Sequence, residues 1–578
     1  MGVVGFRPEL DGGKAGFFRD ADDLLQRHVS RDVEGKQAQF HSVVPMDVGV
    51  RRHVSGVKSV APPSDAVVPR LQGRRHPDDT PFGESGQARG LSERRGFGHT
   101  DERMPASLDR IRRNILRLAA LMAVLLTALV VTLIYWQIVA ADRLLDHPNN
   151  RRLAWKEERI CRGGLYDRTG IALAKSEFEA GNQVRRYPLG EAASLLIGYR
   201  SPRYGRTGLE ARYQSRLSGL TAQRTLLDLR HELLGRQAHG DDVFTTLDAA
   251  LQRAAWGGLA GQTGAVVAIE PTTGAVRCLV SSPAFEPDTV DADWQKLNAD
   301  PDQPLFSRAT QGLYPPGSTF KVVTAAAAAE FGEVKSSTRF TCTGTHKIDN
   351  YKIHCERDRA HGTMDLTQAL VVSCNCTFGQ LAADLGPERF QDMAERFGLG
   401  REVRLELPVT TSRLLNSGQE WYTTLLAQTG FGQGQLAVTP LQMALIAATI
   451  ADGGKQAAPY LVSEVRSYEG QVLERHHPIS ARTVISPSTA DRVAGRMAAV
   501  VAKGSTRKVF AGLSATVAGK TGTAQNPHGR AHAWFIAFAP ASAPTLAVAV
   551  IVENAGSGSQ AAAPIARKVI AAHLRASS

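Results

Sequence analysis

The sequence lacks the motifs of several large protein classes. It has no RNA- or DNA-binding motif, and its arginines and lysines are scattered, so the formal charge of +12 fits an acidic membrane or wall polymer better than nucleic acid. An apparent zinc-protease signature at His231-Glu232 fails because Gly235 stands where the second histidine belongs. Gly430–Gly434 is glycine-rich, but no strand–loop–helix pattern surrounds it, which predicts a turn and no phosphate cradle.

One long run without charged residues extends from Leu118 to Val139, about the length that crosses a bilayer as a helix. A buried helix of a soluble protein is the alternative, but such helices rarely stay apolar all round for so long. Tyr135 and Trp136 lie where interfacial aromatics belong. Arginines precede the run and mixed charges follow it: Arg110, Arg112, Arg113 and Arg117, then Asp142, Arg143 and Asp146. With no small-residue cleavage site, this predicts an uncleaved, single-pass membrane anchor whose N-terminus is cytoplasmic and whose later residues are extracytoplasmic.

The rest of the chain divides around this span. Residues 1–103 show no sustained helical or strand period, so they are either a disordered extension or, as we favour, the product of a mis-assigned start, with Met104 as the true first residue. The predicted segments that follow are a basic cytoplasmic stub at 104–117, the transmembrane helix at 118–139, a small domain at 145–245, and a larger domain at 246–578.

The pattern of the last segment predicts an α+β fold. Two strands, GAVVAIE and AVRCLVSSP, join at a hairpin over Pro271–Gly274, and three more come late, in LSATVAGKTGTAQ, AHAWFIAFAP and TLAVAVIVENAG, before a final helix. Between the two sets lies mostly helix, including one capped by Thr439 with Pro440 in its first turn. We therefore expect a five-stranded, largely antiparallel sheet flanked by helices, beside an all-helical lobe, with a cleft between them.

Three short motifs follow one another in this segment: Ser318-x-x-Lys321, Ser373-Cys374-Asn375 and Lys520-Thr521-Gly522. Alone, each has a bland structural explanation, such as a helix cap, a polar helix face or a turn. Together and in this order they define the penicilloyl-serine acyltransferases. Proline and glycine at 315–317 predict a helix that begins at Ser318 and carries Lys321 on the same face.

The predicted roles follow from chemistry. Ser318 is the nucleophile and Lys321 its base, neutral because burial and the charge of Lys520 lower its pKa. Ser373 relays a proton to the leaving amine, and Asn375 holds a substrate amide or orients the lysine.

The strand of the third motif is predicted to bind substrate. Lys520, Thr521 and Thr523 bind its carboxylate, the N–H groups of Ser318 and Thr523 form an oxyanion hole, and Gly522 lets the substrate lie against the strand.

From about residue 115 onward the sequence resembles the class B penicillin-binding proteins, which are monofunctional peptidoglycan D,D-transpeptidases, and is most similar to the actinobacterial penicillin-binding protein A group. The resemblance rests on the membrane anchor, RGGLYDRTG, YPLGEAASLLIGY, GLEARYQSRL, PPGSTFK, SCN, GQGQLAVTPLQMA and GKTGTAQ, in that order. It implies a penicillin-binding transpeptidase fold and an enzyme without a cofactor.

The resemblance also implies the reaction. Ser318 attacks the D-Ala-D-Ala end of a stem peptide, and the acyl-enzyme passes to an amine of a neighbouring stem peptide, in wall synthesis during division or growth. β-Lactams acylate the same serine. By the same resemblance, 145–245 is the family's pedestal or dimerisation-type domain, which carries partner contacts, and 246–578 is its penicillin-binding transpeptidase domain, the catalytic domain. The implied partner is a polytopic glycosyltransferase of the shape, elongation, division and sporulation family.

Related activities of the same fold are the alternatives. A β-lactamase needs a glutamate for deacylation, but Ser412 stands at that place in Ser412–Asn416. A D,D-carboxypeptidase and a non-catalytic β-lactam sensor also remain, although a sensor would carry more membrane spans. A bifunctional class A enzyme is excluded, since about 100 residues before the catalytic domain cannot hold a glycosyltransferase.

Four of the six cysteines, at 342, 355, 374 and 376, lie close together in the extracytoplasmic segment, where disulfides persist. We expect Cys355 to be bridged to Cys374, with Cys342–Cys355 as the second choice. No metal site is predicted, although zinc held with His346, His354 or His361 stays open as an alternative.

Overall fold

The computed structural model describes residues 106–140, 160–179, 182–220, 238–527 and 529–576. The predictions for residues 1–103, for the charges after the span and for His231 to Gly235 lie outside these ranges. The chain divides into two units, 1–103 and 104–578, and the described residues all belong to the second.

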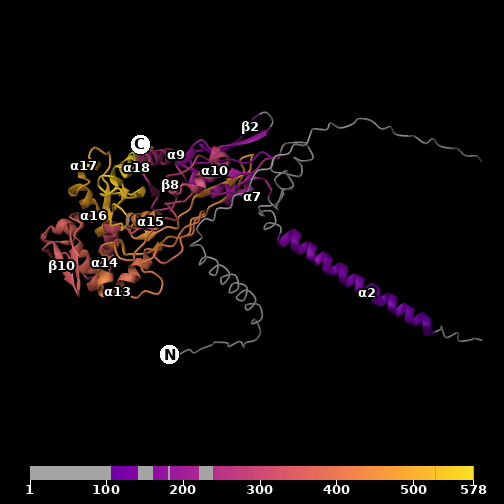
Figure 1. Ribbon diagram of the computed structural model, residues 1–578, viewed down its shortest axis with the longest axis horizontal. Coiled ribbons are helices and arrows are strands. Elements are labelled where there is room, and N and C mark those ends of the chain that lie inside the picture. Colours follow the sequence, from indigo (N-terminus) through magenta and orange to yellow (C-terminus); the bar gives the residue numbers. More distant parts are fainter. Residues whose placement is uncertain (1–105, 141–159, 180–181, 221–237, 528, 577–578) are drawn as a thin grey trace, which may run out of the picture. The chain divides into compact units, whose positions relative to one another are not determined.

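The N-terminal helix α2, Ala106–Ile134, continues into a π-helix, η1, at Tyr135–Val139 (Figure 1). Arg110–Ile138 is long and apolar enough to cross a membrane, and it includes most of the predicted span. The hydroxyls of Thr127 and Thr132 donate to carbonyls four residues back, so these polar groups are satisfied within the helix itself.

A six-stranded sheet forms the pedestal, in the order β15-β14-β6-β1-β2-β3. Its first strands are β1 (Leu165–Tyr166), β2 (Ala172–Glu179), β3 (Asn182–Arg186) and β6 (Asp242–Thr245). Strands β14 (Val462–Arg466) and β15 (Val472–Arg475) come from the segment that we predicted to be wholly catalytic domain. The hairpin predicted at RGGLYDRTG is present, because β1 and β2 pair antiparallel around residues 167–170.

Short elements complete the pedestal and its junction. They are η2 (Gly190–Ala192), α5 (Ser194–Ile197), β4 (Arg200–Ser201), β5 (Gly205–Arg206), α6 (Gly208–Arg212), α7 (Gln214–Leu217), η3 (Pro287–Thr289) and α10 (Val290–Ala299).

A buried ion network explains two of the pedestal motifs. Glu210 of GLEAR lies between Arg162 of RGG and Arg185 of β3, and all three are at most 9% exposed. Arg162 Nε donates to Glu210 Oε2 at 2.9 Å and Arg185 Nε to Glu210 Oε1 at 2.7 Å. Burial raises the pKa of Glu210, but the two guanidinium groups outweigh it and hold this pKa at about 2.

The second sheet has five strands in the order β17-β18-β19-β7-β8, all antiparallel, as predicted. They are β17 (Ala518–Ala524), β18 (His532–Ala539), β19 (Leu546–Val552), β7 (Gly264–Ile269) and β8 (Val276–Ser282). Both faces are covered, so strands such as β18 are buried at every position and show no polar alternation. The free edge of β17 lies at one side of the sheet.

Alternate residues of these strands face two helical layers. Val266 and Ala268 pack with α9 (Ala249–Leu259) and α18 (Ala562–Ala576). Val267 and Ile269 belong to the core cluster that also contains α11 (Lys321–Glu330) and α15 (Pro440–Ala451). Thr439 accepts from Gln442 N and caps α15, as its sequence predicts.

The remaining helices form the lobe beyond the sheet: α12 (Leu366–Val371), α13 (Asn375–Arg396), α14 (Thr423–Gly430), α16 (Pro487–Lys503) and α17 (Arg507–Phe510). Small ribbons attach to it: β9 (Phe340–Cys342) with β12 (Gly362–Met364), β10 (Thr345–Ile348) with β11 (Tyr351–His354), the turn η5 (Glu356–Asp358), and β13 (Lys455–Gln456) with β16 (Arg482–Thr483). Figure 1 shows β10 beside α13 and α14.

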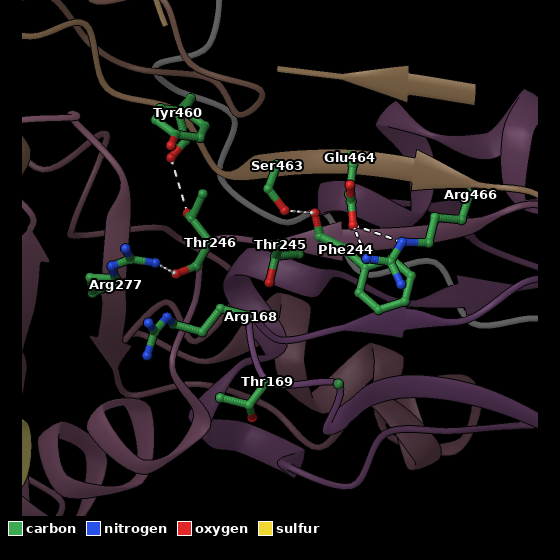
Figure 2. A pocket seen from close by; sticks show the side chains of 11 residues that line it. Arg168, Thr169, Phe244, Thr245, Thr246, Arg277, Tyr460, Ser463, Glu464 and Arg466 are labelled. Carbon is green, nitrogen blue, oxygen red and sulfur yellow. Dashed lines mark hydrogen bonds and ion pairs between the residues drawn. The ribbon is translucent and has the colours of Figure 1, made fainter. Parts of the chain in front are cut away.

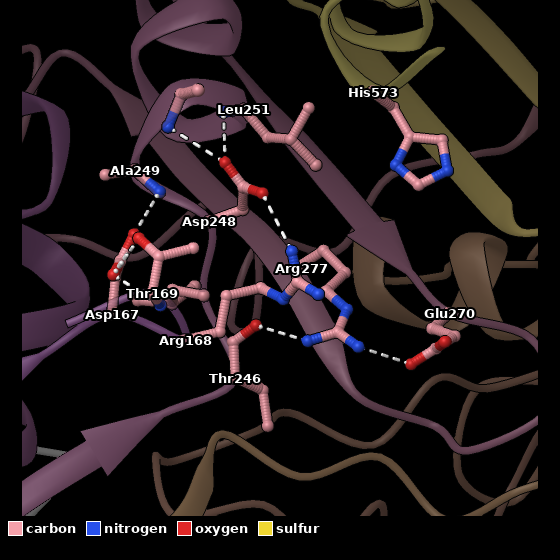
Figure 3. A network of polar contacts seen from close by, with 12 residues as sticks. Asp167, Arg168, Thr169, Thr246, Asp248, Ala249, Leu251, Glu270, Arg277 and His573 are labelled. Atoms are coloured by element: carbon pink, nitrogen blue, oxygen red, sulfur yellow. Dashed lines mark hydrogen bonds and ion pairs between the residues drawn. The ribbon is translucent and has the colours of Figure 1, made fainter. Parts of the chain in front are cut away.

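Polar contacts join the pedestal to the second sheet (Figure 3). Asp167 Oδ2 accepts from Ala249 N, and Asp248 Oδ1 accepts from Ala250 N and Leu251 N, so one carboxylate from each side caps helix α9. Asp248 is thus the N-cap of this helix. Arg277 of β8 donates to the carbonyl of Thr246 at 3.0 Å and to Glu270.

Candidate active site

Ser318, the predicted nucleophile, lies in a 3₁₀ turn, η4, at Gly317–Phe320, and the α-helix begins only at Lys321. The expectation of an α-helix starting at the serine is therefore wrong in detail. In a 3₁₀ turn residues i and i+3 eclipse, so Ser318 and Lys321 still share one face. Ser318 is half-buried, whereas Lys321 is fully buried.

Backbone contacts from two distant segments hold this turn. Gly317 N donates to the carbonyl of Gly432 at 2.9 Å, and a Cβ on Gly432 would lie 1.9 Å from Gly317 O. On the other side, Trp534 Nε1 donates to the carbonyl of Pro315 at 3.0 Å. Gly432 belongs to the turn that we predicted at 430–434, but its support of the nucleophile was not predicted. In the sequence, the support given by Gly432 is indicated only by the residue type, because glycine readily adopts a positive φ, which is 83° here.

Two buried lysines converge on the second motif. Lys321 Nζ donates to Ser373 O at 2.7 Å, to Asn375 Oδ1 at 2.7 Å and to Ser373 Oγ at 3.2 Å. Lys520 Nζ donates to the same Ser373 Oγ at 3.0 Å and to Thr521 O at 2.9 Å. The structure thus brings Lys321 and Lys520 together on the hydroxyl of Ser373, and Asn375 joins them through Lys321 Nζ.

Burial lowers the pKa of both ammonium groups. It brings the pKa of Lys321 to about 8, and burial followed by the charge of Lys321 lowers the pKa of Lys520 well below its ordinary value. Burial lowers the pKa of Lys321 as predicted, whereas the charge of the other lysine, which we also expected to act there, lowers the pKa of Lys520 instead. A neutral amine is therefore accessible near neutral pH.

Ser373 and Asn375 are held in position by the backbone around them. Ser373 adopts a positive φ of 56°, which few non-glycine residues adopt and which is found at functional sites. The amide of Asn375 donates through Nδ2 to the carbonyl of His354 at 2.7 Å, which fixes Oδ1 toward Lys321. His354 is a contact that motif reasoning missed, since it lies 21 residues away in sequence.

The third motif lies on β17, an edge strand. Lys520 and Gly522 are buried, Thr521 is half-buried and Thr523 is exposed. A Cβ on Gly522 would lie 2.8 Å from Pro316 O and 2.9 Å from Thr319 Cγ2, so this glycine lets β17 approach the nucleophile turn. An edge strand next to Ser318 has unpaired backbone groups that an extended peptide can use.

The predicted disulfide is not formed in the structure, where all six cysteines are free. Cys355 Sγ lies 3.7 Å from both Cys342 Sγ and Cys374 Sγ and 3.5 Å from Cys376 Sγ, against about 2.0 Å for a bonded pair. The cluster itself is therefore as close as predicted, but neither expected pairing is made.

A pocket of about 510 Å³ lies elsewhere, at the junction of β6 and β14 (Figure 2). Arg466 stacks over the ring of Phe244 at 4.2 Å and pairs with Glu464. None of the predicted catalytic residues lines this pocket, so it belongs to the pedestal junction rather than to the candidate active site.

Comparison with known families agrees with the geometry. Residues 264–571 match the penicillin binding protein transpeptidase domain, and residues 162–243 match the penicillin binding protein A dimerisation domain. The chain belongs to the penicillin-binding protein transpeptidase family.

The PbpA relatives of this penicillin-binding protein match over nearly their whole length, and an MrdA relative over about two thirds of its length. It is 34% identical to the peptidoglycan D,D-transpeptidase PbpA of Mycolicibacterium smegmatis, over 79% of this chain and 98% of the relative. Identity to PbpA of Mycobacterium tuberculosis is 35%, over 82% and 99% of the two chains. Peptidoglycan D,D-transpeptidase MrdA of Haemophilus influenzae is 33% identical over 64% of this chain and 63% of the relative.

Solved structures give the same result. Penicillin-binding protein A from M. tuberculosis as a ceftriaxone acyl-enzyme complex matches with a TM-score of 0.69 and 34% identity, covering 72% of this chain and 99% of that one. The penicillin G acyl-enzyme complex of the same protein matches with a TM-score of 0.67. These matches confirm the penicillin-binding transpeptidase fold.

Proposed function

We propose that this chain is a serine-type peptidoglycan D,D-transpeptidase whose nucleophile is Ser318. The observation that carries the proposal is the convergence on Ser373 Oγ of Lys520 and of Lys321, which follows the half-buried Ser318 by three residues. The names and acyl-enzyme complexes of the relatives support it.

Acylation begins with loss of the Ser318 proton. In the described part of the chain Ser318 Oγ makes no hydrogen bond, while the three donors of Lys321 are taken by Ser373 and Asn375. A neutral Lys321 keeps two N–H donors, enough for Ser373 O and Asn375 Oδ1, so it can release Ser373 Oγ and turn its lone pair to accept the serine proton; a pKa of about 8 makes this form accessible. Ser318 Oγ then bonds to the carbonyl carbon of the D-Ala-D-Ala amide or of a β-lactam.

The tetrahedral oxygen that forms carries negative charge. The N–H groups of Ser318 and Thr523 are the proposed donors to it, and the close approach of Gly522 to the nucleophile turn supports this pairing. The leaving amine takes its proton from Ser373 Oγ, which both lysines can resupply. Lys520, Thr521 and Thr523 bind the terminal carboxylate of the donor peptide.

The acyl-enzyme then meets an acceptor amine, and reversal of these steps forms the cross-link and frees Ser318. A β-lactamase would instead need an acid to activate water. The residue at that place, Ser412, is buried, and its hydroxyl accepts from Thr439 N at 3.0 Å as a structural group. This observation favours transfer to an amine over rapid hydrolysis.

The membrane helix and the pedestal support a proposal for the location and the partners of the enzyme. We infer a single-pass protein with α2 in the cell membrane, residues before it in the cytoplasm and the catalytic domain outside. The apolar character of Arg110–Ile138 supports this arrangement. The pedestal is the proposed contact region for other wall-synthesis proteins, including a polytopic glycosyltransferase.

A labelled penicillin that cannot cross membranes tests the proposal. Added to intact cells, it is expected to remain covalently on the wild-type chain and to be absent from Ser318→Ala. Retention over hours supports a transpeptidase, whereas release within minutes would indicate a β-lactamase or carboxypeptidase. Labelling only after the cells are opened would contradict the inferred orientation.

A further inference from the structure

A charged cluster outside the three motifs lies at the end of strand β19. Glu553 directly follows β19, and its Oε1 accepts two hydrogen bonds, from the Tyr314 hydroxyl at 2.7 Å and from Arg308 Nε at 2.9 Å. Tyr314 precedes Ser318 by four residues. We propose that Glu553 is a positioning residue, which acts through Tyr314 to place Ser318 for attack. This inference rests on the proposed function and assigns a further residue to it.

A stiff segment joins Tyr314 to the nucleophile turn. Two prolines, at 315–316, stand between Tyr314 and Gly317, the first residue of η4, and a proline ring fixes φ at about −65°. The backbone of Tyr314 bonds in both directions with that of Val438, at 3.0 and 2.9 Å. Because this segment has few free torsions, a shift of Tyr314 is passed on to Ser318 and is not absorbed on the way.

Glu553 holds Tyr314 by its buried hydroxyl. Tyr314 is 8% exposed, and its ring lies edge-on to the rings of His532 and Trp534, with centroids 5.6 and 6.2 Å away. Burial, followed by the charge of Glu553, raises the pKa of Tyr314, so the hydroxyl keeps its proton and donates to the carboxylate. A bond to an ionised acceptor is stronger than one between neutral groups. Ring packing and this bond together hold Tyr314 in one position.

Glu553 is itself fixed from two sides. Its backbone N–H donates to the carbonyl of Thr263 at 2.8 Å. Arg308, which is 6% exposed, donates to the carboxylate through Nε. The other two nitrogens of Arg308 donate to the carbonyls of Asp302 and Gln303, at 2.7 and 3.3 Å. The carboxylate is therefore a fixed point to which the tyrosine can be attached.

The next residue, Asn554, holds the other side of the active site. Its Oδ1 accepts from Asn526 Nδ2 at 2.6 Å, and Asn526 lies three residues after Thr523. Its backbone N–H donates to His532 Nδ1 at 3.2 Å, and His532 lies opposite the last residue of β17. Asn554 has a φ of 52°, a conformation that asparagine adopts more readily than most residues. Glu553 and Asn554 thus connect the nucleophile turn with the end of β17, the two segments that carry the proposed oxyanion donors.

The kinetics of acylation by a fluorescent penicillin test the proposal. Rapid mixing of the full-length chain in detergent with a range of penicillin concentrations separates the dissociation constant of the non-covalent complex from the rate constant of acylation. Glu553→Ala is expected to lower the rate constant about 30-fold, because the serine is misplaced, and to change the dissociation constant by less than about twofold. An unchanged rate constant in folded Glu553→Ala chain would overturn the proposal, and so would a loss confined to the dissociation constant.

Two further variants separate the hydrogen bond from the charge. Both bonds are made by Oε1, so the amide oxygen of Glu553→Gln can accept them, and the acylation rate constant is expected to stay within about threefold of wild type. Tyr314→Phe keeps the ring and the ion pair with Arg308 but removes the bond, and is expected to slow acylation about as much as Glu553→Ala. Slow acylation by Glu553→Gln, or normal acylation by Tyr314→Phe, would contradict the assigned bond. Tyr314→Phe also decides if Glu553→Ala does not fold.

Glu270→Ala is the matched control. Glu270 directly follows β7 of the same sheet, pairs with Arg277 and accepts from Thr273 Oγ1 at 2.8 Å. Its side chain is 29% exposed, against 20% for Glu553. Both of these partners lie on the β7–β8 hairpin, so this variant loses a comparable ion pair and is expected to acylate at the wild-type rate. Equal slowing by Glu270→Ala and Glu553→Ala would show a general loss of stability and overturn the positioning role.

The wild-type chain distinguishes this inference from the proposed function. If wild type is acylated no more than Ser318→Ala, the proposed function is wrong, and the positioning role falls with it. If wild type is acylated at Ser318 and Glu553→Ala reacts at the same rate, the positioning role alone is wrong.

Discussion

At the scale of single residues, the candidate active site is held by contacts from residues outside the three motifs. Ser318 and Lys321 were predictable because their spacing and order with the other motifs are distinctive. Gly432 and His354 were not, because each acts through one backbone carbonyl, on Gly317 and on Asn375 respectively. A carbonyl contact leaves no trace in residue type, so only the folded chain shows it.

Gly432→Ala tests this indirect support. The new Cβ would lie 1.9 Å from Gly317 O, so the nucleophile turn must shift. We expect acylation by fluorescent penicillin to slow about 100-fold, since displacements near 1 Å at a reacting group have such effects.

Gly418→Ala is the matched control for this variant. Gly418 also has a positive φ, 76°, but nothing lies within 4 Å of its added Cβ. The positive φ is expected to lower the free energy of unfolding of this control by about 1 kcal/mol, and acylation is expected to be normal. Normal acylation by a folded Gly432→Ala chain would show that the nucleophile turn does not depend on Gly432.

At the scale of elements, the sequence pattern of a segment predicted whether that segment forms a strand or a helix. It did not predict which distant strands pair with one another. Strands β7, β8, β17, β18 and β19 and helix α15 form where their hydrophobic runs and caps indicate. The addition of β14 and β15 to the pedestal sheet was missed, because β14 pairs with β6 more than 200 residues earlier and its short pattern does not identify a partner.

The cysteine cluster shows a related limit of sequence patterns. Spacing correctly indicated that the thiols meet, but a disulfide and a metal site need the same proximity. Only the sulfur distances and the position of His361 separate these two hypotheses.

The buried network around Glu210 gives a prediction for the pedestal. Glu210→Gln leaves Arg162 and Arg185 buried without a counter-charge and is expected to lower the free energy of unfolding by about 3–5 kcal/mol at pH 7. Glu177→Gln removes the exposed pair with Lys175 and should have a much smaller effect. Urea unfolding of the full chain in detergent measures both.

The same network has a defined pH dependence. The pKa of Glu210 is about 2 in the folded chain, below about 4.3 in the unfolded chain. A depressed carboxyl pKa stabilises the fold above the unfolded value, and this contribution disappears as the pH falls through the folded value. The gap between wild type and Glu210→Gln should therefore narrow between about pH 4 and pH 2. A gap that stays constant over this range would contradict the ionised triad.

At the scale of the whole molecule, the pedestal and the segment after it share structure across residue 245, where the sequence placed their boundary. Strand β14 takes its partner β6 from before that residue, and helix α9 takes the cap Asp167 from the pedestal. The buried side chains of Val462 and Val465 lie on this crossing strand. The catalytic domain therefore depends on pedestal residues for part of its own structure.

This dependence predicts the behaviour of two fragments. A fragment of residues 160–578 keeps β1 and β6 beside β14 and is expected to be monodisperse and acylated by penicillin. A fragment of residues 246–578 exposes the edge of β14 and removes the Asp167 cap, so we expect aggregation on size exclusion and at least tenfold less acylation. Both retain every proposed catalytic residue, so a difference between them measures the pedestal alone. Equal acylation and equal unfolding midpoints would show that the shared sheet contributes nothing to the active site, and the boundary at 245 would then stand.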